Sequence, residues 1–76
     1  MQSINVLLSS INDVKEFVNT VSKYDFDIDL VSGRYIVDAK SIMGIFSLDL
    51  SKPIKLEIHT DNAAGIINDL KPFTAE

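Results

Sequence analysis

The sequence contains no cysteine and no tryptophan, and its 76 residues include only three glycines and two prolines. The lack of cysteine excludes a disulfide-stapled scaffold and a thiolate metal site. With 46% apolar and 24% charged residues, the chain also falls outside the disordered, collagenous and low-complexity classes. We therefore expect a folded domain with a single hydrophobic core.

Long apolar runs and an excess of positive charge are also missing. No apolar run is longer than that at residues 6–8, which is far shorter than the roughly 20 residues that a membrane-spanning helix needs. Residues 1–5 carry no basic side chain, so we expect no signal peptide. Seven basic and eleven acidic side chains give a net charge of −4, the wrong sign for nucleic-acid binding. The sequence thus predicts a cytoplasmic protein without a membrane or nucleic-acid partner.

The sequence does contain short apolar patterns that no linker, repeat or charge run separates, so we expect one domain over residues 1–76. Residues 3–8 are rich in Ile, Val and Leu and predict a strand. Ser9 and Ser10 then offer N-caps for a helix. Its apolar positions are spaced by three and four residues and should face the core: Ile11, Val14, Phe17, Val18 and Val21.

The second half of the chain predicts three more strands and two more helices. Residues 27–31 and 34–37 flank the turn signal Ser32-Gly33 and indicate a hairpin. A mostly apolar segment at residues 41–50 precedes an alternating strand at residues 54–58.

Thr60 or Asp61 can cap a last helix, which Pro72 ends near Lys71. The order β-α-β-β-α-β-α predicts an α+β fold. Its architecture is an open-faced sandwich, a four-stranded antiparallel sheet with three helices on one face.

The segment after the hairpin holds two apolar clusters when it is drawn as a helix. Ile42, Met43 and Phe46 fall on one side, whereas Ile45 and Leu48 fall on another. A helix on a sheet buries one stripe, and Met and Phe suit a surface that adapts to several partners. Two alternatives remain at this point: an exposed patch of Ile42, Met43 and Phe46, or a helix enclosed in the core.

Ser41 lies where this helix should begin. An N-cap serine stabilises a helix by roughly 1 kcal/mol, and that structural role is sufficient to explain the residue. The alternative is a phosphorylation site, because a phosphate at a helix N-terminus meets free N–H groups and the positive end of the dipole.

Two stretches of the sequence resemble a known family. They are residues 22–28, SKYDFDI, and residues 37–48, VDAKSIMGIFSL. Both are similar to the histidine-containing phosphocarrier (HPr) family of the bacterial sugar phosphotransferase system, and the match runs in register from Ser22 to about His59. The resemblance implies the family's β-α-β-β-α-β-α sandwich, in agreement with the predicted element order.

The family's phosphoacceptor motif, G-x-H-x-R-P in the loop before the first helix, has no counterpart here. In register from Ser22, the histidine position falls on Ser10, the arginine position on Asn12 and the proline position on Asp13. The loop itself is about three residues shorter than the family's. We therefore expect no phosphotransfer through histidine and name no catalytic residue.

A second family feature is retained. In Gram-positive members the serine of K-S-I-M-G is phosphorylated by a regulatory ATP-dependent kinase, and this position matches Ser41. The family's docking patch beside that serine carries over to Ile42, Met43 and Phe46. The resemblance thus implies protein partners, among them phosphotransferase or regulatory proteins. Asp49 stands where members often have glycine, a departure that weakens the match to the kinase's target.

We find no metal or cofactor signature. Asp25-x-Asp27-x-Asp29 imitates the start of a calcium loop, but its sixth position is Leu30 rather than glycine. His59 is the only histidine and lies at the end of a predicted strand, which favours a surface role. We expect neither a metal nor a cofactor.

The function that the sequence favours is an HPr-like binding or regulatory module, not an enzyme, that lacks phosphohistidine chemistry. One alternative is a phosphotransfer protein with a non-histidine acceptor such as Ser10. The other is a self-associating structural domain that uses the same patch as a homodimer interface.

Overall fold

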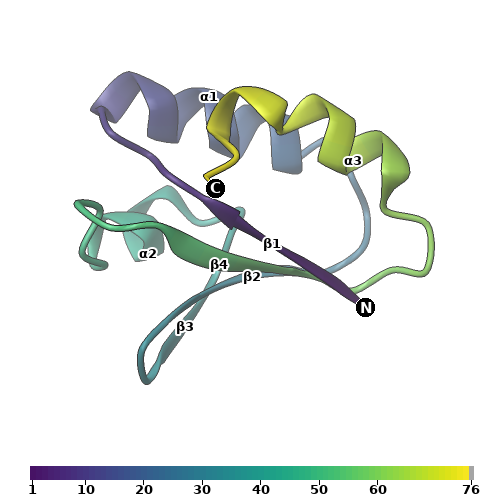
Figure 1. Cartoon of the computed structure of the whole chain (residues 1–76). Coiled ribbons are helices and arrows are strands. Elements are labelled where there is room, and N and C mark those ends of the chain that lie inside the picture. Colours follow the sequence, from purple (N-terminus) through teal and green to yellow (C-terminus); the bar gives the residue numbers. More distant parts are fainter. Residues whose placement is uncertain (76) are drawn as a thin grey trace.

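The structure is a computed structural model and describes residues 1–75. Four antiparallel strands form one sheet in the order β1-β4-β2-β3, and the helices lie over one face of it (Figure 1). The elements are β1 (Gln2–Val6), α1 (Ile11–Val21), β2 (Ile28–Ser32), β3 (Tyr35–Asp38), α2 (Ile42–Phe46), β4 (Ile54–Ile58), α3 (Ala64–Asp69) and the 3-10 turn η1 (Lys71–Phe73). The predicted α+β fold and its element order are confirmed.

The period-two pattern of the central strand β4 accounts for the core. Ile54, Leu56 and Ile58 point toward the helices and are buried, while the residues between them lie on the open face. Leu56 stands opposite Ile4 of β1 and Leu30 of β2. The helices complete this cluster with a set of fully buried side chains: Val14, Phe17 and Val21 of α1, Ile45 of α2 and Ile66 of α3.

A tight turn joins β2 to β3. Ser32 pairs with Tyr35, which leaves Gly33 and Arg34 as the two turn residues. Gly33 has a φ of +61°, the value expected at the first central position of a type II′ hairpin turn, where a Cβ is disfavoured. The turn fixes the register of the hairpin and leaves β3 at the edge of the sheet.

The last helix begins differently from the prediction. Its N-cap is Ala63, and no side chain caps it. The Thr60 hydroxyl accepts a hydrogen bond from the Asn62 backbone N–H at 3.2 Å. This bond closes a local turn over residues 60–62, directly before the cap. The predicted cap at Thr60 or Asp61 is wrong because the chain makes this extra turn before α3.

The chain after α3 returns to β1, which the sequence did not predict. Val6 forms a bridge with Thr74, and the Ala75 N–H donates to the Asn5 carbonyl at 2.8 Å. The Phe73 ring meets Phe17 edge-on, with the ring centroids 6.0 Å apart. The tail therefore covers the outer edge of β1 and closes the core over α1. Across residues 1–75, no helix has the length and apolar character to cross a membrane.

Candidate functional site at the first turns of α1 and α2

The polar groups at the first turn of α1 form hydrogen bonds with one another. Ser10 is the N-cap, and its Oγ accepts a hydrogen bond from the Asp13 backbone N–H at 3.1 Å. The Asp13 carboxylate in turn accepts from the Ser9 N–H at 3.2 Å and from the Ser9 hydroxyl at 2.9 Å. This reciprocal arrangement is a variant of the capping box. It places a carboxylate at the positive end of the helix dipole.

A hollow of about 390 Å³ lies beside Ser10, between α1 and the end of α2. Apolar side chains and hydroxyls line it: Leu8, Ser9, Ser10, Ile11, Phe46, Leu50 and Ser51. None of these lining residues is a cation. No side chain that lines this hollow could therefore balance the charge of a phosphate beside Ser10.

The first turn of α2 is capped in the same way by Ser41. Its Oγ accepts from the Gly44 N–H at 3.3 Å, and the first turn contains no acidic residue. A Cβ at Gly44 would lie 3.4 Å from both Ser41 Oγ and Val37 Cβ, at the short limit of ordinary van der Waals contact. The first turn of α2 thus lies close to β3. Ser41 is exposed.

The two apolar clusters of the α2 segment separate as the helical wheel suggested. Ile45 is fully buried, whereas Met43 is 77% exposed and Phe46 is 42% exposed. Ile42 is half-buried and packs against the core, so it forms the margin of the patch rather than its centre.

The prediction that Ile11 faces the core is wrong. Ile11 fits the apolar stripe of α1, yet it is 65% exposed and lines the same hollow as Phe46. The residue is the first of the helix, and Leu8 already fills the core beneath this end. The exposed apolar surface therefore extends from α2 to the first turn of α1. We call Ile11, Ile42, Met43 and Phe46 the α1–α2 patch.

Lys40 holds the segment before β2 to the N-terminus of α2. Its ammonium donates to the backbone carbonyls of Tyr24 at 2.6 Å and Phe26 at 3.0 Å. The Tyr24 hydroxyl donates to Asp69 of α3 at 2.5 Å, and this hydrogen bond, followed by desolvation and the charge of Asp69, raises the pKa of Tyr24. The Lys40 contacts thus hold the start of α2, and the Tyr24 contact holds α3; neither involves a residue of the α1–α2 patch.

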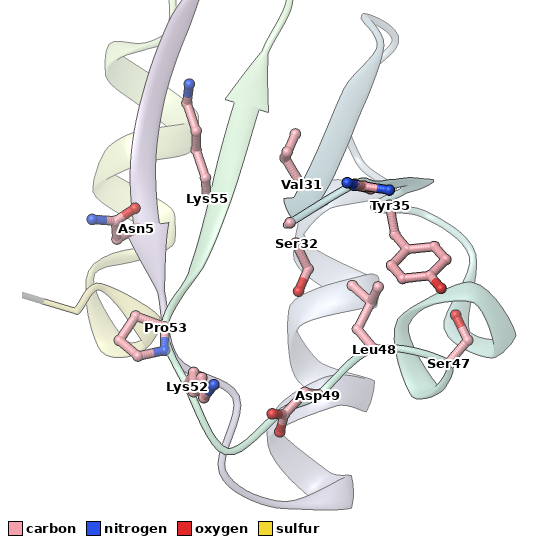
Figure 2. Close-up of a pocket in the computed structure, with 12 residues that line it drawn as sticks. Asn5, Val31, Ser32, Tyr35, Ser47, Leu48, Asp49, Lys52, Pro53 and Lys55 are labelled. Carbon is pink, nitrogen blue, oxygen red and sulfur yellow. The ribbon is translucent and has the colours of Figure 1, made fainter.

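A second hollow of about 730 Å³ lies on the other side of α2, below the β2–β3 turn. Figure 2 shows Asn5 and Lys55 on its sheet side and Tyr35, Ser47 and Leu48 across from them. Three cations, Arg34, Lys52 and Lys55, line it together with one carboxylate, that of Asp49.

The Asp49 carboxylate is not free in this second hollow. Hydrogen bonds from the Ser51 hydroxyl and N–H, at 2.5 and 3.0 Å, lower the pKa of Asp49. Lys52 adds a weaker Coulombic effect in the same direction. Asp49 therefore stays ionised and stabilises the loop that leads from α2 to β4.

The only histidine lies far from Ser10. His59 follows the end of β4 that pairs with Gln2, whereas α1 begins beyond Val6, at the opposite end of β1. Four residue steps along a strand separate these ends by about 13 Å. His59 Nε2 is 3.0 Å from Asp29 Oδ2 on the open face of the sheet. The fold thus does not bring an imidazole to the acceptor position.

Comparison with known proteins agrees with the fold. A family model described as the PTS HPr component phosphorylation site matches residues 12–75. The match begins after Ser10, so the expected acceptor position lies outside it. The crystal structure of HPr-C-His from Thermoanaerobacter tengcongensis is similar, with 30% sequence identity and a TM-score of 0.74. The alignment covers 92% of this chain and 90% of that chain.

Proposed function

Since the chain belongs to the HPr family of the phosphotransferase system, we propose that it is a binding or regulatory module that carries no phosphate on histidine. HPr proteins are phosphocarriers rather than enzymes in the usual sense, and they interact with other proteins of that system. In this role the protein binds partners of that system but does not relay phosphate. It also places the protein in the cytoplasm.

The observation that carries the proposal is the composition of the first turn of α1. A phosphohistidine site needs an imidazole and a cation beside the free N–H groups of the helix. Here Ser10 and the Asp13 carboxylate occupy the turn, and Asp13 bonds back to Ser9. Negative charge at that place repels an incoming phosphate.

The α1–α2 patch supports the binding part of the proposal. Met43, Phe46 and Ile11 are exposed, although burial of such side chains would stabilise the fold by roughly 1.5–3 kcal/mol each. A methionine and an aromatic ring beside a shallow hollow provide adaptable contact area for a protein partner. We assign this surface to partner docking.

Ser41 gives the patch a candidate switch. Its hydroxyl is exposed, and it precedes a helix whose first turn carries no acid. A phosphate there would meet the N–H groups of α2 and place charge next to Met43. Phosphorylation would therefore alter docking with little damage to the fold.

The test is incubation with the phosphotransferase-system kinase that uses phosphoenolpyruvate, with a histidine-bearing HPr as positive control. We expect the control to gain one acid-labile phosphate and this chain to remain unmodified in intact-mass spectra. Stoichiometric labelling of His59 would contradict the proposal. Labelling of Ser10 would instead support the alternative of a non-histidine acceptor.

A further inference from the structure

The open face of the sheet carries a row of acidic side chains. Asp38 of β3, Asp29 of β2 and Glu57 of β4 occupy directly opposed positions on three neighbouring strands. Like charges directly opposite one another across a sheet are destabilising. One lysine, Lys55, lies 3.5 Å from Glu57, and because its side chain is exposed this pair offsets little of the repulsion. The row is therefore a site at which a cation would stabilise the fold.

His59 adds a nitrogen donor to this row. It lies two residues after Glu57 and next to Asp29, with 3.0 Å between its Nε2 and Asp29 Oδ2. The ligand atoms of Asp29, Glu57 and His59 all lie within 4.8 Å of one another. Two ligands of a tetrahedral zinc ion, each at about 2.1 Å from the metal, are about 3.4 Å apart. No two of the three atoms are therefore more than about 1.4 Å farther apart than that spacing.

The strands hold these donors in place. The register sets Asp29 opposite Glu57, and the His59 N–H donates to the Asp27 carbonyl at 3.0 Å, which extends the pairing past the end of β4. Asp29 and Glu57 are half-buried and His59 is exposed, so the site is open to an ion from solution. Strand pairing thus holds the backbone that carries the three donors.

We propose that Asp29, Glu57 and His59 bind one zinc-class divalent cation, with water completing a four-coordinate site. One imidazole and two carboxylates are a donor set that zinc accepts. Calcium requires six to eight oxygen ligands, which this group does not supply. The sequence alone does not predict this site, because Asp29 is 28 and 30 positions from the other two ligands and only the sheet brings them together.

The test uses the tag-free protein and zinc chloride, with titration calorimetry and proton NMR. Because His59 is the only histidine, its two ring C–H signals report on this site alone. We expect saturable one-to-one binding and a shift of both ring signals. The near-isosteric variants Asp29→Asn and Glu57→Gln, which keep the side-chain shape, should each bind at least about tenfold more weakly, as should His59→Gln.

Two further variants sharpen the test. Lys55→Gln removes a positive charge beside Glu57 and should tighten zinc binding. Glu16→Gln changes the net charge as Glu57→Gln does, but it lies on α1 in the helical layer and should leave zinc affinity unchanged. Unshifted ring signals at millimolar zinc would overturn the proposal. So would binding that persists at full strength in both Asp29→Asn and Glu57→Gln.

Discussion

The first turns of α1 and α2 share a cap and differ in charge. In both helices a serine Oγ accepts from the backbone N–H three residues later, at 3.1 Å in α1 and 3.3 Å in α2. In α1 that third residue is Asp13, whose carboxylate bonds back to Ser9. In α2 it is Gly44, and no acid lies in the turn. The same capping geometry therefore leaves one turn anionic and the other open to an anion.

The two helices also differ in how they are held. α1 has 11 residues and buries Val14, Phe17 and Val21, whereas α2 has five residues and buries only Ile45. α1 thus carries a large share of the core, while α2 depends on its cap, on Ile45 and on the Lys40 contacts beside it. Substitutions at the buried positions of α1 should change stability, and substitutions at the exposed positions of α2 should change binding.

The largest expected effect is that of Phe17→Ala. Phe17 is fully buried and meets Phe73 edge-on, so its truncation removes contacts on α1 and on the tail together. We expect the free energy of unfolding to fall by about 3–5 kcal/mol, a large part of a small domain's stability. Urea unfolding followed by circular dichroism measures it. A loss below about 1 kcal/mol would mean that α1 does not carry the core.

A smaller effect should separate the two serine caps directly. Aspartate is a good N-cap, but at position 10 it would stand beside the Asp13 carboxylate. We expect Ser10→Asp to be less stable than Ser41→Asp by about 0.5 kcal/mol in low salt. The gap should shrink in 1 M sodium chloride, since salt screens exposed charges. If the difference in stability between the two variants does not change with salt, charge does not distinguish the two turns.

The smallest effect on stability should come from Met43→Asp. Because Met43 is 77% exposed, we expect unfolding to change by no more than about 0.5 kcal/mol. Binding to a phosphotransferase-system partner should nevertheless be lost, since a charge would stand in the α1–α2 patch. Thermal melts and pull-down measure the two effects, and Ile45→Asp is the matched buried control.

The outcome for Met43→Asp also decides between two uses of the patch. Sedimentation of the wild type reports self-association, the structural alternative. If Met43→Asp unfolds the domain, the residue belongs to the core and the docking assignment is wrong. Ser41→Asp should weaken binding while the melt stays unchanged.

The parts of the fold that follow local rules could be predicted from sequence. The period-two burial of Ile54, Leu56 and Ile58 and the Ser41 cap each depend on residues within one or two turns of chain. The exposure of Ile11 could not be predicted in this way. Its position in the apolar stripe of α1 is that of a core residue, and it is exposed because Leu8 already fills the core at this end of the helix. The pairing of Thr74 with Val6 likewise depends on contacts across the whole chain.

The same limit applies to the candidate sites. The exposure of Met43 and Phe46 could be predicted because a helical wheel and a family resemblance agree on them, and their role in docking stays a prediction. Asp29 and Glu57 lie opposite each other only because of the β2–β4 register, and their separation in the sequence gives no sign of this pairing. Long-range strand pairing is therefore where sequence reasoning failed most.

The position of β4 between β1 and β2 has a consequence for synthesis on the ribosome. Residues 2–6 form the first of the four strands to be made, yet their partner, residues 54–58, is the last. The β2–β3 hairpin can form before β4 exists, whereas β1 stays unpaired until β4 has been made. Such late, long-range closure is slow and leaves strand edges open to aggregation. A nascent chain of this protein should therefore need protection until β4 has left the exit tunnel.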